Sequence, residues 1–215
     1  MSKKCPKHIH VRRINSTATT PLHVEYTQQG DKDGENFEQI EYNMTKRPID
    51  IRECAGEIIR AMRPGILLTT KSGEKVNSMA IGWGTIGIEW EKPIFIAFVR
   101  TCRFTHEMLQ SNGEFTINVP VGDFPRKAIG FLGSKSGRDM DKIAEAGLTL
   151  VEPNIISVPG LKEFPLTLEC RVLYQQQQND HELNEDIKRR FYTMETADHT
   201  AFYAEIVAAY VIEEP

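Results

Sequence analysis

The sequence predicts a mainly β protein, an antiparallel barrel with a few short helices. From Gly65 onward, short segments rich in Ile, Val, Phe and Thr follow one another closely, as the strands of hairpins do. The helical patterns between them are brief and do not alternate regularly with the strands, which argues against an α/β fold. The chain has 215 residues, of which 40% are hydrophobic, and this is enough for one domain with a continuous core.

The elements are expected in a definite order. After Pro48, apolar residues at helical spacing predict a helix over Ile51–Met62, which Pro64 and Gly65 end. Strands are expected at Gly65–Thr70, Val76–Gly84, Pro93–Arg100, Glu114–Val119, Leu148–Val151, Leu166–Tyr174 and Ala201–Ile212. Further helices are expected at Thr105–Ser111, Pro125–Leu132 and Met140–Ala146, with Thr105, Asp123 and Asp139 as their N-caps.

Two polar segments stand outside this pattern. Residues 1–47 are polar and irregular, with one weak strand signal around Leu22–Tyr26, and we interpret them as an N-terminal extension. The barrel domain then covers residues 48–215. Within it, residues 175–196 begin with four glutamines and continue with many charges, which is typical of an exposed loop or a solvated helix. We interpret this segment as a polar insertion.

Composition excludes several classes of protein. A net charge of -4 argues against a generally basic nucleic-acid-binding protein, and no apolar run approaches the roughly 20 residues of a membrane helix. The N-terminal residues show no secretory signal, so we expect a cytoplasmic protein whose four widely spaced cysteines are reduced thiols. Cys5–His10 could hold a soft metal, but a single terminal cluster without a partner is typical of a mobile tail, and no metal site is expected.

One motif suggests a dinucleotide site but lacks the required context. Gly82–Gly87 matches the spacing G-x-G-x-x-G, which binds a pyrophosphate only where a strand turns into a helix. Here Pro93 opens another strand a few residues later, so the chain has no room for that helix. A Rossmann fold is therefore rejected.

The strand at Val76–Gly84 carries small residues on one of its faces. Ser78, Ala80, Gly82 and Gly84 alternate along it, so that this face becomes nearly bare. Glycine weakens a strand, and one reason to retain it is the close approach of a flat ligand or of another backbone. Tight packing against a helix or a second subunit is the alternative, and the strand alone does not decide between them.

Two basic clusters precede predicted helices. Arg100 and Arg103 lie with Thr101 and Thr105 where a strand ends and a helix begins, and this arrangement suits an anion such as phosphate. The second cluster, Ser134–Asp139 followed by Lys142, again combines hydroxyl, glycine and base. Surface ion pairs are the alternative for each cluster. Together with a bare strand face, the two clusters suggest a mononucleotide site.

Five segments occur in a definite order along the chain: Asn77–Trp83, Arg100–Thr105, Glu114–Pro120, Ser136–Lys142 and Asp198–Thr200. This ordered set resembles the flavin reductase-like family, which includes flavoredoxin and has an FMN-binding split β-barrel fold. The resemblance covers roughly Met62 to Val211. The extension at residues 1–47 and the insertion at 175–196 depart from the family pattern.

The resemblance implies a homodimer with one FMN per subunit near the dimer interface. It implies that Asn77, Ser78, Met79, Ala80, Ile81, Gly82 and Trp83 border the isoalloxazine, largely with main-chain groups. Arg100, Arg103 and Thr105 would hold the phosphate, helped by Ser136, Arg138 and Lys142. His199 would face the flavin or the nicotinamide and is the candidate catalytic residue. The alternative for His199 is a histidine at a strand start, paired with Asp198.

The expected function is that of an FMN-binding oxidoreductase that transfers hydride from NAD(P)H to flavin. The alternative is a flavoredoxin-like FMN electron carrier, without its own NAD(P)H reductase activity, that exchanges electrons with a redox protein partner. A barrel that has lost the cofactor is a third hypothesis.

Overall fold

The computed structural model describes residues 44–192 and 198–213, and residues 46–212 form one compact unit. The strands are β1 (Thr45–Pro48), β2 (Ile66–Ser72), β3 (Lys75–Ile81), β4 (Gly84–Glu89), β5 (Lys92–Arg100), β6 (Glu114–Val119), β7 (Leu150–Val151), β8 (Gly160–Leu161), β9 (Leu166–Gln177) and β10 (His199–Glu213). The helices are α1 (Ile51–Ala61), α2 (Phe104–Ser111), α3 (Arg126–Ser134), α4 (Lys142–Glu145) and α5 (Glu185–Phe191), with a short 3-10 turn at Asp180–Glu182. The prediction of a mainly β chain with a few short helices is confirmed.

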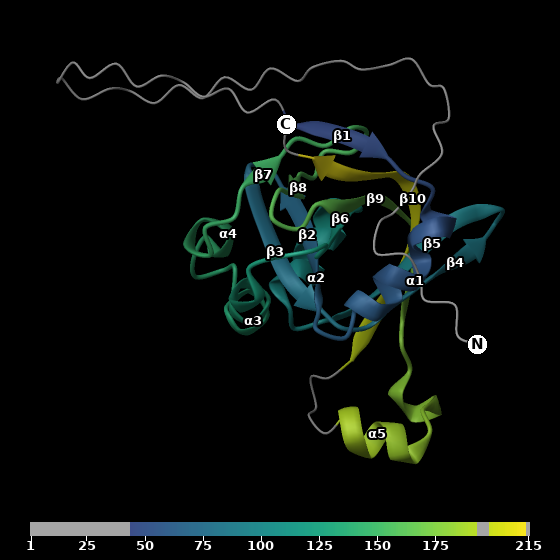
Figure 1. Ribbon diagram of the computed structural model, residues 1–215. Coiled ribbons are helices and arrows are strands. Elements are labelled where there is room, and N and C mark those ends of the chain that lie inside the picture. Colours follow the sequence, from purple (N-terminus) through teal and green to yellow (C-terminus); the bar gives the residue numbers. More distant parts are fainter. Residues whose placement is uncertain (1–43, 193–197, 214–215) are drawn as a thin grey trace, which may run out of the picture. The chain divides into compact units, whose positions relative to one another are not determined.

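The strands form an antiparallel sheet that curves into a split barrel (Figure 1). Its order is β3-β2-β6-β9-β10-β5-β4, and β1 also pairs with β10. Within the described part of the chain, β3 pairs only with β2 and β4 only with β5, so these two strands are the free edges of the split. The predicted split β-barrel is therefore confirmed. Because β1 starts at Thr45, the sheet begins earlier than the predicted boundary at residue 48.

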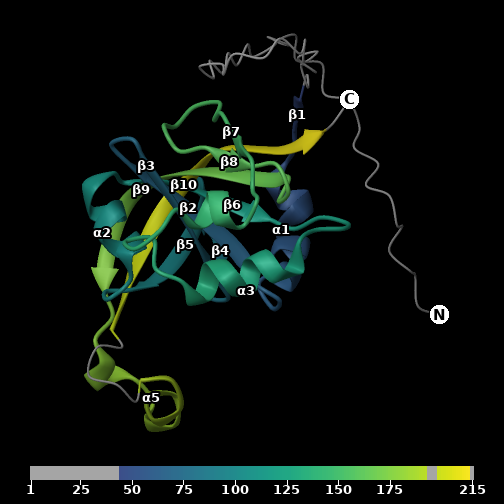
Figure 2. The same cartoon turned by 90° about the vertical axis from the view of Figure 1, so that its left-hand side faces the viewer.

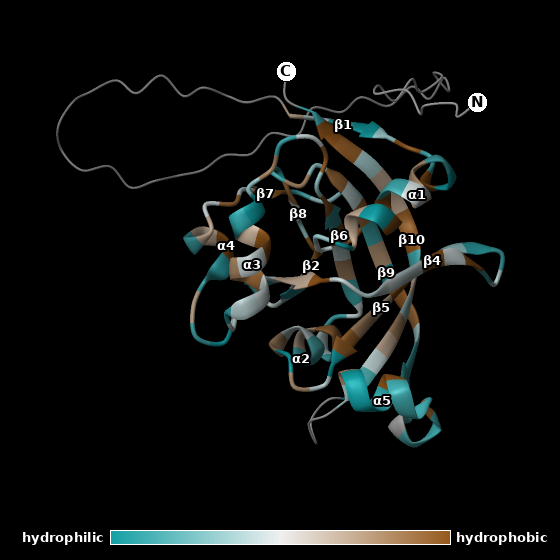
Figure 3. Cartoon of the chain, turned by 60° about the horizontal axis from the view of Figure 1, so that its bottom comes forward, coloured by the Kyte–Doolittle hydropathy of each residue, from teal (hydrophilic) through white to brown (hydrophobic). Residues whose placement is uncertain are grey.

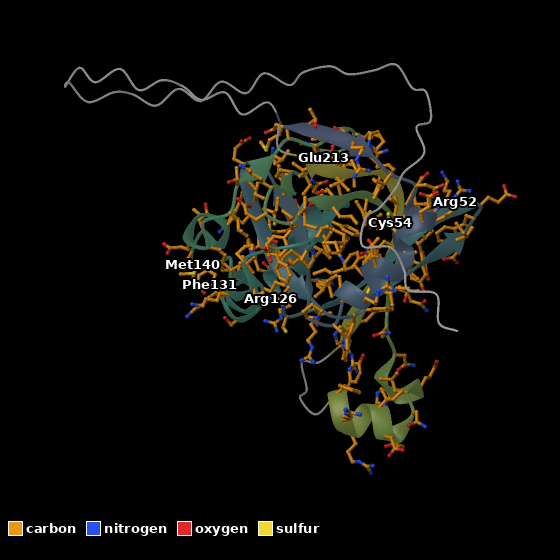
Figure 4. The ribbon with its side chains drawn as sticks, in the orientation of Figure 1. Arg52, Cys54, Arg126, Phe131, Met140 and Glu213 are labelled. Atoms are coloured by element: carbon orange, nitrogen blue, oxygen red, sulfur yellow. The ribbon has the colours of Figure 1, made fainter. Side chains whose placement is uncertain are left out.

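The barrel interior is the main hydrophobic core. Phe95, Phe115 and Phe202 are fully buried there, and Ile58 and Cys54 of α1 pack against them. Asp50 caps α1 by accepting a hydrogen bond from the Arg52 backbone N–H at 3.0 Å. Figure 4 shows Arg52 and Cys54 on this helix, of which Arg52 is exposed and Cys54 is buried. The predicted helix over Ile51–Met62 is thus confirmed, and it closes one side of the barrel.

A second core lies between the outer face of β2 and β3 and the helices α3 and α4 (Figure 1). It includes Leu67, Ala80, Leu132 and Ile143. A Cβ placed on Gly133 of α3 would lie 3.3 Å from the Ala80 Cβ, so helix and strand approach closely because both residues are small. Packing against a helix, the alternative that the sequence left open, therefore explains the small residues of β3 as far as Ala80.

Several predicted boundaries are wrong for local reasons. The strand predicted at Val76–Gly84 ends at Ile81, and the chain turns at Gly82–Trp83 to start β4. The helix caps predicted at Thr105, Asp123 and Asp139 are not used. α2 and α3 have Arg103 and Pro125 at the cap position without a side-chain bond, whereas Asp141 caps α4 by accepting from the Ile143 and Ala144 backbone N–H groups.

The predicted polar insertion divides into a strand extension and an exposed helix. β9 continues through the glutamines to Gln177, and α5 follows with no buried residue. Figure 2 shows α5 standing away from the barrel beyond the ends of β9 and β10, and Figure 3 shows that most of its residues are hydrophilic. The strand predicted around Leu22–Tyr26 and the Cys5–His10 cluster lie outside the described residues.

Within residues 44–192 and 198–213, no helix has both the length and the apolar character needed to cross a membrane. The same residues contain no group of three or more His, Cys, Asp or Glu side chains that could hold a metal ion.

Candidate functional site

A shallow pocket of about 350 Å³ lies at the turn between β3 and β4. Its lining residues are Gly82, Trp83, Gly84, Phe98, Gln178 and Tyr192. Gly82 is exposed, and among the described residues a Cβ placed on it would meet only the Met62 carbonyl oxygen, at 3.4 Å. A Cβ on Gly84 would instead lie 2.8 Å from the Phe95 ring, so Gly84 is required by core packing. The backbone at Gly82 is thus the part of the predicted bare face that is open to a ligand.

Aromatic rings surround His199 beside this pocket. The Trp83 ring lies 5.1 Å from the His199 ring at an interplanar angle of 35°, and the Tyr192 ring lies 5.4 Å from it at 70°. Phe191 meets Trp83 edge to face at 5.3 Å. His199 itself is buried and lies opposite Arg100 in the β5–β10 register. Trp83, by contrast, is 40% exposed and offers part of its ring to the pocket.

The two predicted phosphate arginines lie at the end of β5. Arg103 lies in the turn between β5 and α2, and its backbone N–H donates to the Arg100 carbonyl at 3.0 Å. The side chain of Arg103 is exposed. Arg100 is partly buried, and its Nη2 donates to the Phe191 carbonyl at 3.5 Å. The exposed Arg103 guanidinium can therefore reach an anion near the start of α2, whereas Arg100 lies closer to the aromatic rings and would use its remaining N–H groups.

The other predicted phosphate residue, Thr105, is buried between α2 and β3. Its hydroxyl accepts a hydrogen bond from Asn77 Nδ2 at 2.9 Å, and both residues are almost fully inaccessible. The Asn77 Oδ1 is buried without a hydrogen-bond partner among the described residues. A Cβ on Gly137 would lie 2.1 Å from that oxygen, so the loop before α4 packs directly on Asn77. Thr105 and Asn77 thus fix α2 to β3, and a phosphate can reach neither side chain in this arrangement.

The second basic cluster does come close to the first. Burial, and then the nearby charge of Arg103, lower the pKa of Lys142 to about 8. Lys142 Nζ donates to the Leu132 carbonyl at 3.0 Å. Arg138 forms an ion pair with Glu107 of α2, and its backbone N–H donates to the Ser136 hydroxyl at 3.2 Å. The structure therefore brings Lys142 toward Arg103, whereas Arg138 holds the loop to α2 and the Ser136 hydroxyl accepts a bond within the loop.

In the middle of β3, main-chain groups are available to a ligand, whereas the side chains are buried or packed. The Ser78 hydroxyl is fully buried, accepts from Thr69 at 3.1 Å and donates to the Leu68 carbonyl at 3.4 Å. Ile81 is buried in the barrel core, and Met79 packs partly against it. Because β3 is an edge strand, its outward N–H and C=O groups can still bond a ligand. The main-chain role of the segment in binding a ring stays a prediction.

Four residues that the sequence analysis did not assign to a site belong to this one: Phe98, Gln178, Phe191 and Tyr192. Three of them come from the predicted polar insertion. The only signal in the sequence is the pair Phe191–Tyr192 at the end of a strongly polar segment, since two adjacent aromatic residues there indicate a contact with the barrel.

Comparison with known proteins shows the family and the fold of the chain. The chain matches the family model described as flavin reductase like domain over residues 60–215. The chain belongs to this family. An uncharacterized protein of Archaeoglobus fulgidus is 32% identical over 134 residues, which is 62% of this chain and 64% of that protein. The chain thus matches slightly less than two thirds of the length of this relative.

Two solved members of the flavin reductase-like fold are flavoredoxins. The flavoredoxin of Desulfovibrio vulgaris (Miyazaki F) is 25% identical, with a TM-score of 0.54 over 69% of each chain. The flavoredoxin from Methanosarcina acetivorans is 27% identical, with a TM-score of 0.53 over 69% of this chain and 68% of that one. The resemblance seen in the sequence is therefore confirmed at the level of family and fold.

Proposed function

We propose that this flavin reductase-like protein binds FMN and transfers hydride from NAD(P)H to the flavin. The observation that carries the proposal is the pocket at Gly82–Trp83, which combines open backbone with an exposed indole, while the buried His199 lies against Trp83 outside the pocket lining. Flat apolar walls with a few polar groups are typical of sites for planar cofactors. When bound, FMN would supply the redox chemistry by accepting a hydride from the dihydronicotinamide ring.

The residues present fit FMN at this end of β3. The ring would lie by Gly82, where a side chain is absent, and the outward main-chain groups of the β3 edge would bond its polar rim. The phosphate would lie toward Arg100 and Arg103, with the positive charge of Lys142 behind them. The face of β3 from Val76 to Ala80 does not fit, because α3 and α4 cover it.

The protein's own groups would bind and orient the reactants. The arginines would fix the phosphate by charge-assisted hydrogen bonds, and Trp83 would limit the ring to one orientation. His199 is buried against Trp83 and Tyr192 and does not line the pocket, so it would act on the flavin or the nicotinamide by holding the Trp83 ring in place. Hydride transfer itself needs no general acid or base, because the hydride ion carries the hydrogen nucleus together with both electrons.

The test is the absorption spectrum of the purified protein, followed by anaerobic addition of NADH or NADPH. We expect flavin bands after reconstitution with FMN, and bleaching of these bands by at least one of the two nucleotides. A yellow protein that neither nucleotide bleaches would support the alternative, a flavoredoxin-like electron carrier, which the two similar flavoredoxins favour. A protein that takes up no FMN would contradict both. The homodimer expected from the family resemblance stays a prediction.

The charge of Lys142 predicts a pH dependence of FMN binding. Lys142 loses its proton near pH 8, whereas a phosphate monoester is already fully ionised above its second pKa of about 6. We therefore expect FMN affinity to fall about fivefold between pH 7 and 9.5, as about 1 kcal/mol of attraction is lost, while riboflavin affinity stays constant. The measurement is quenching of flavin fluorescence, and Lys142→Met should remove the difference.

The same lysine provides an independent control on folding. Its folded pKa of about 8 lies below its ordinary value of 10.5, so the unfolded chain binds more protons between these two pH values. The free energy of unfolding should therefore rise from pH 8 to pH 10.5, and Lys142→Met should lack this rise. An FMN affinity that follows pH equally in the Lys142→Met variant would show that the lysine does not act on the phosphate.

A further inference from the structure

The polar segment between β9 and β10 supplies one wall of the pocket. Gln178 follows the last residue of β9, and its backbone N–H donates to the His199 carbonyl at 2.8 Å. Tyr192 follows the last residue of α5. The Tyr192 hydroxyl donates to Gln178 Oε1 at 3.1 Å. Two residues separated by α5 are thus joined at the point where both line the pocket.

The end of this segment is held to the barrel by its aromatic residues. α5 contributes no buried residue to the core. Its last residue, Phe191, packs on Trp83, and the next residue, Tyr192, packs on His199. Arg100 adds a bond to the Phe191 carbonyl. The position of Tyr192 is therefore fixed by contacts with residues of the candidate site itself, and a packing role for α5 in the core is excluded within the described residues.

The hydrogen bond from Tyr192 determines which polar atoms of Gln178 remain for a ligand. Burial raises the pKa of Tyr192, so its hydroxyl keeps its proton and donates. Gln178 Oε1 accepts the hydrogen bond from this hydroxyl, which fixes the orientation of the carboxamide. The two N–H groups of Gln178 are then the donors that the pocket wall offers, at the rim of a space bordered by the Trp83 and Phe98 rings.

We propose that Gln178 binds the carboxamide oxygen of a nicotinamide ring in this pocket, and that Tyr192 is the positioning residue that orients Gln178. This inference rests on the proposed function and extends it, because it assigns nicotinamide recognition to the inserted segment. The space beside Trp83 suits flat rings, and a nicotinamide there would stack on the flavin. Both rings carry carbonyl acceptors at their edges, so the effect of Gln178 variants on FMN affinity and on nicotinamide affinity decides which ring the Gln178 donors bind.

The experiment measures equilibrium binding with a probe that cannot react. FMN-loaded protein is titrated with 1,4,5,6-tetrahydronicotinamide adenine dinucleotide, which keeps the carboxamide but donates no hydride, and binding is followed by the flavin difference spectrum. Gln178→Leu should raise the Kd about five- to tenfold, the usual effect of one lost hydrogen bond. Gln178→Glu keeps the acceptor for Tyr192 but loses both N–H donors, and it should raise the Kd at least as much.

Matched variants separate recognition from structure. Gln176→Leu changes an exposed glutamine of β9 outside the pocket lining and should leave the Kd unchanged. Tyr192→Phe keeps the ring on His199 and removes only the hydroxyl, so we expect about a threefold increase in Kd. Because Tyr192 acts through Gln178, adding Tyr192→Phe to Gln178→Leu should have no further effect. FMN affinity should stay within twofold in all these variants.

Two results would overturn the inference: a Kd of the probe that is unchanged in Gln178→Leu and Gln178→Glu, or equal additive losses in the double variant.

If the protein does not take up FMN, the proposed function fails, but the titration still applies. The chain has two tryptophans, so Trp90→Phe leaves Trp83 as the only indole, and its fluorescence reports the pocket directly. Gln178-dependent binding without oxidation of NADH or NADPH would contradict hydride transfer and support the inference.

Discussion

Replacing both Arg100 and Arg103 by alanine is expected to weaken FMN binding by about 100-fold or more and to leave riboflavin binding within about threefold of its original value. Each charge-assisted hydrogen bond contributes about 1.5–3 kcal/mol, which is roughly tenfold or more in affinity for each arginine. Only FMN carries the phosphate, so only FMN loses these bonds. The measurement is quenching of flavin fluorescence by the protein, with the two ligands titrated in parallel.

The structure adds two controls to this prediction. Arg100 also donates to the Phe191 carbonyl, so its removal can disturb the protein as well as the ligand. Arg103→Ala alone avoids this and should lower FMN affinity about tenfold or more. Arg126, the exposed first residue of α3 labelled in Figure 4, lies outside the candidate site, and Arg126→Ala should leave both ligands unaffected. Equal losses for FMN and riboflavin in Arg103→Ala would refute the phosphate assignment.

Gly82→Val is expected to lower FMN affinity at least tenfold while the protein remains folded. Within the part of the chain that the structure describes, a Cβ at this position meets only the Met62 carbonyl oxygen, at 3.4 Å. The rest of an added side chain would extend into the pocket beside Trp83. That space is where the flavin ring would lie, so the branched side chain would exclude the ring by steric overlap. Flavin content after reconstitution and urea unfolding are the two measurements.

The contrast with Ala80→Val distinguishes ligand exclusion from overpacking. Ala80 packs in the core beneath α3, where a Cβ on Gly133 would already lie 3.3 Å away. Added methyl groups there should lower the free energy of unfolding by about 1–3 kcal/mol, as overpacked cores do. Gly82→Val should cost much less stability. Normal flavin content in a folded Gly82→Val protein would show that the ring does not lie at the β3–β4 turn.

The sequence by itself determined the fold class and most of the strands. Runs rich in β-branched and aromatic residues placed β5 and β6 within a residue of their observed ends, because such residues pack on a pleated surface and the turns between them are short. The sequence also predicted that the segment containing α5 is exposed, since a segment so rich in charge has no apolar face to bury. The helix caps could not be predicted as well, because several acidic or hydroxyl residues lie within a turn of each helix start.

Only the tertiary structure decided which parts of the predicted site are accessible. Small residues in β3 have the same pattern whether a ligand or a helix lies against them, and the fold placed α3 over Ala80 while leaving Gly82 open. Likewise, Thr105 and Arg103 stand two positions apart, but the first bonds Asn77 inside the protein and the second faces solvent. Gln178 and Tyr192 reach the pocket because the ends of β9 and α5 return to the same rim of the barrel. Such contacts join residues far apart in the chain, and local residue patterns, which reflect only neighbouring positions, do not specify them.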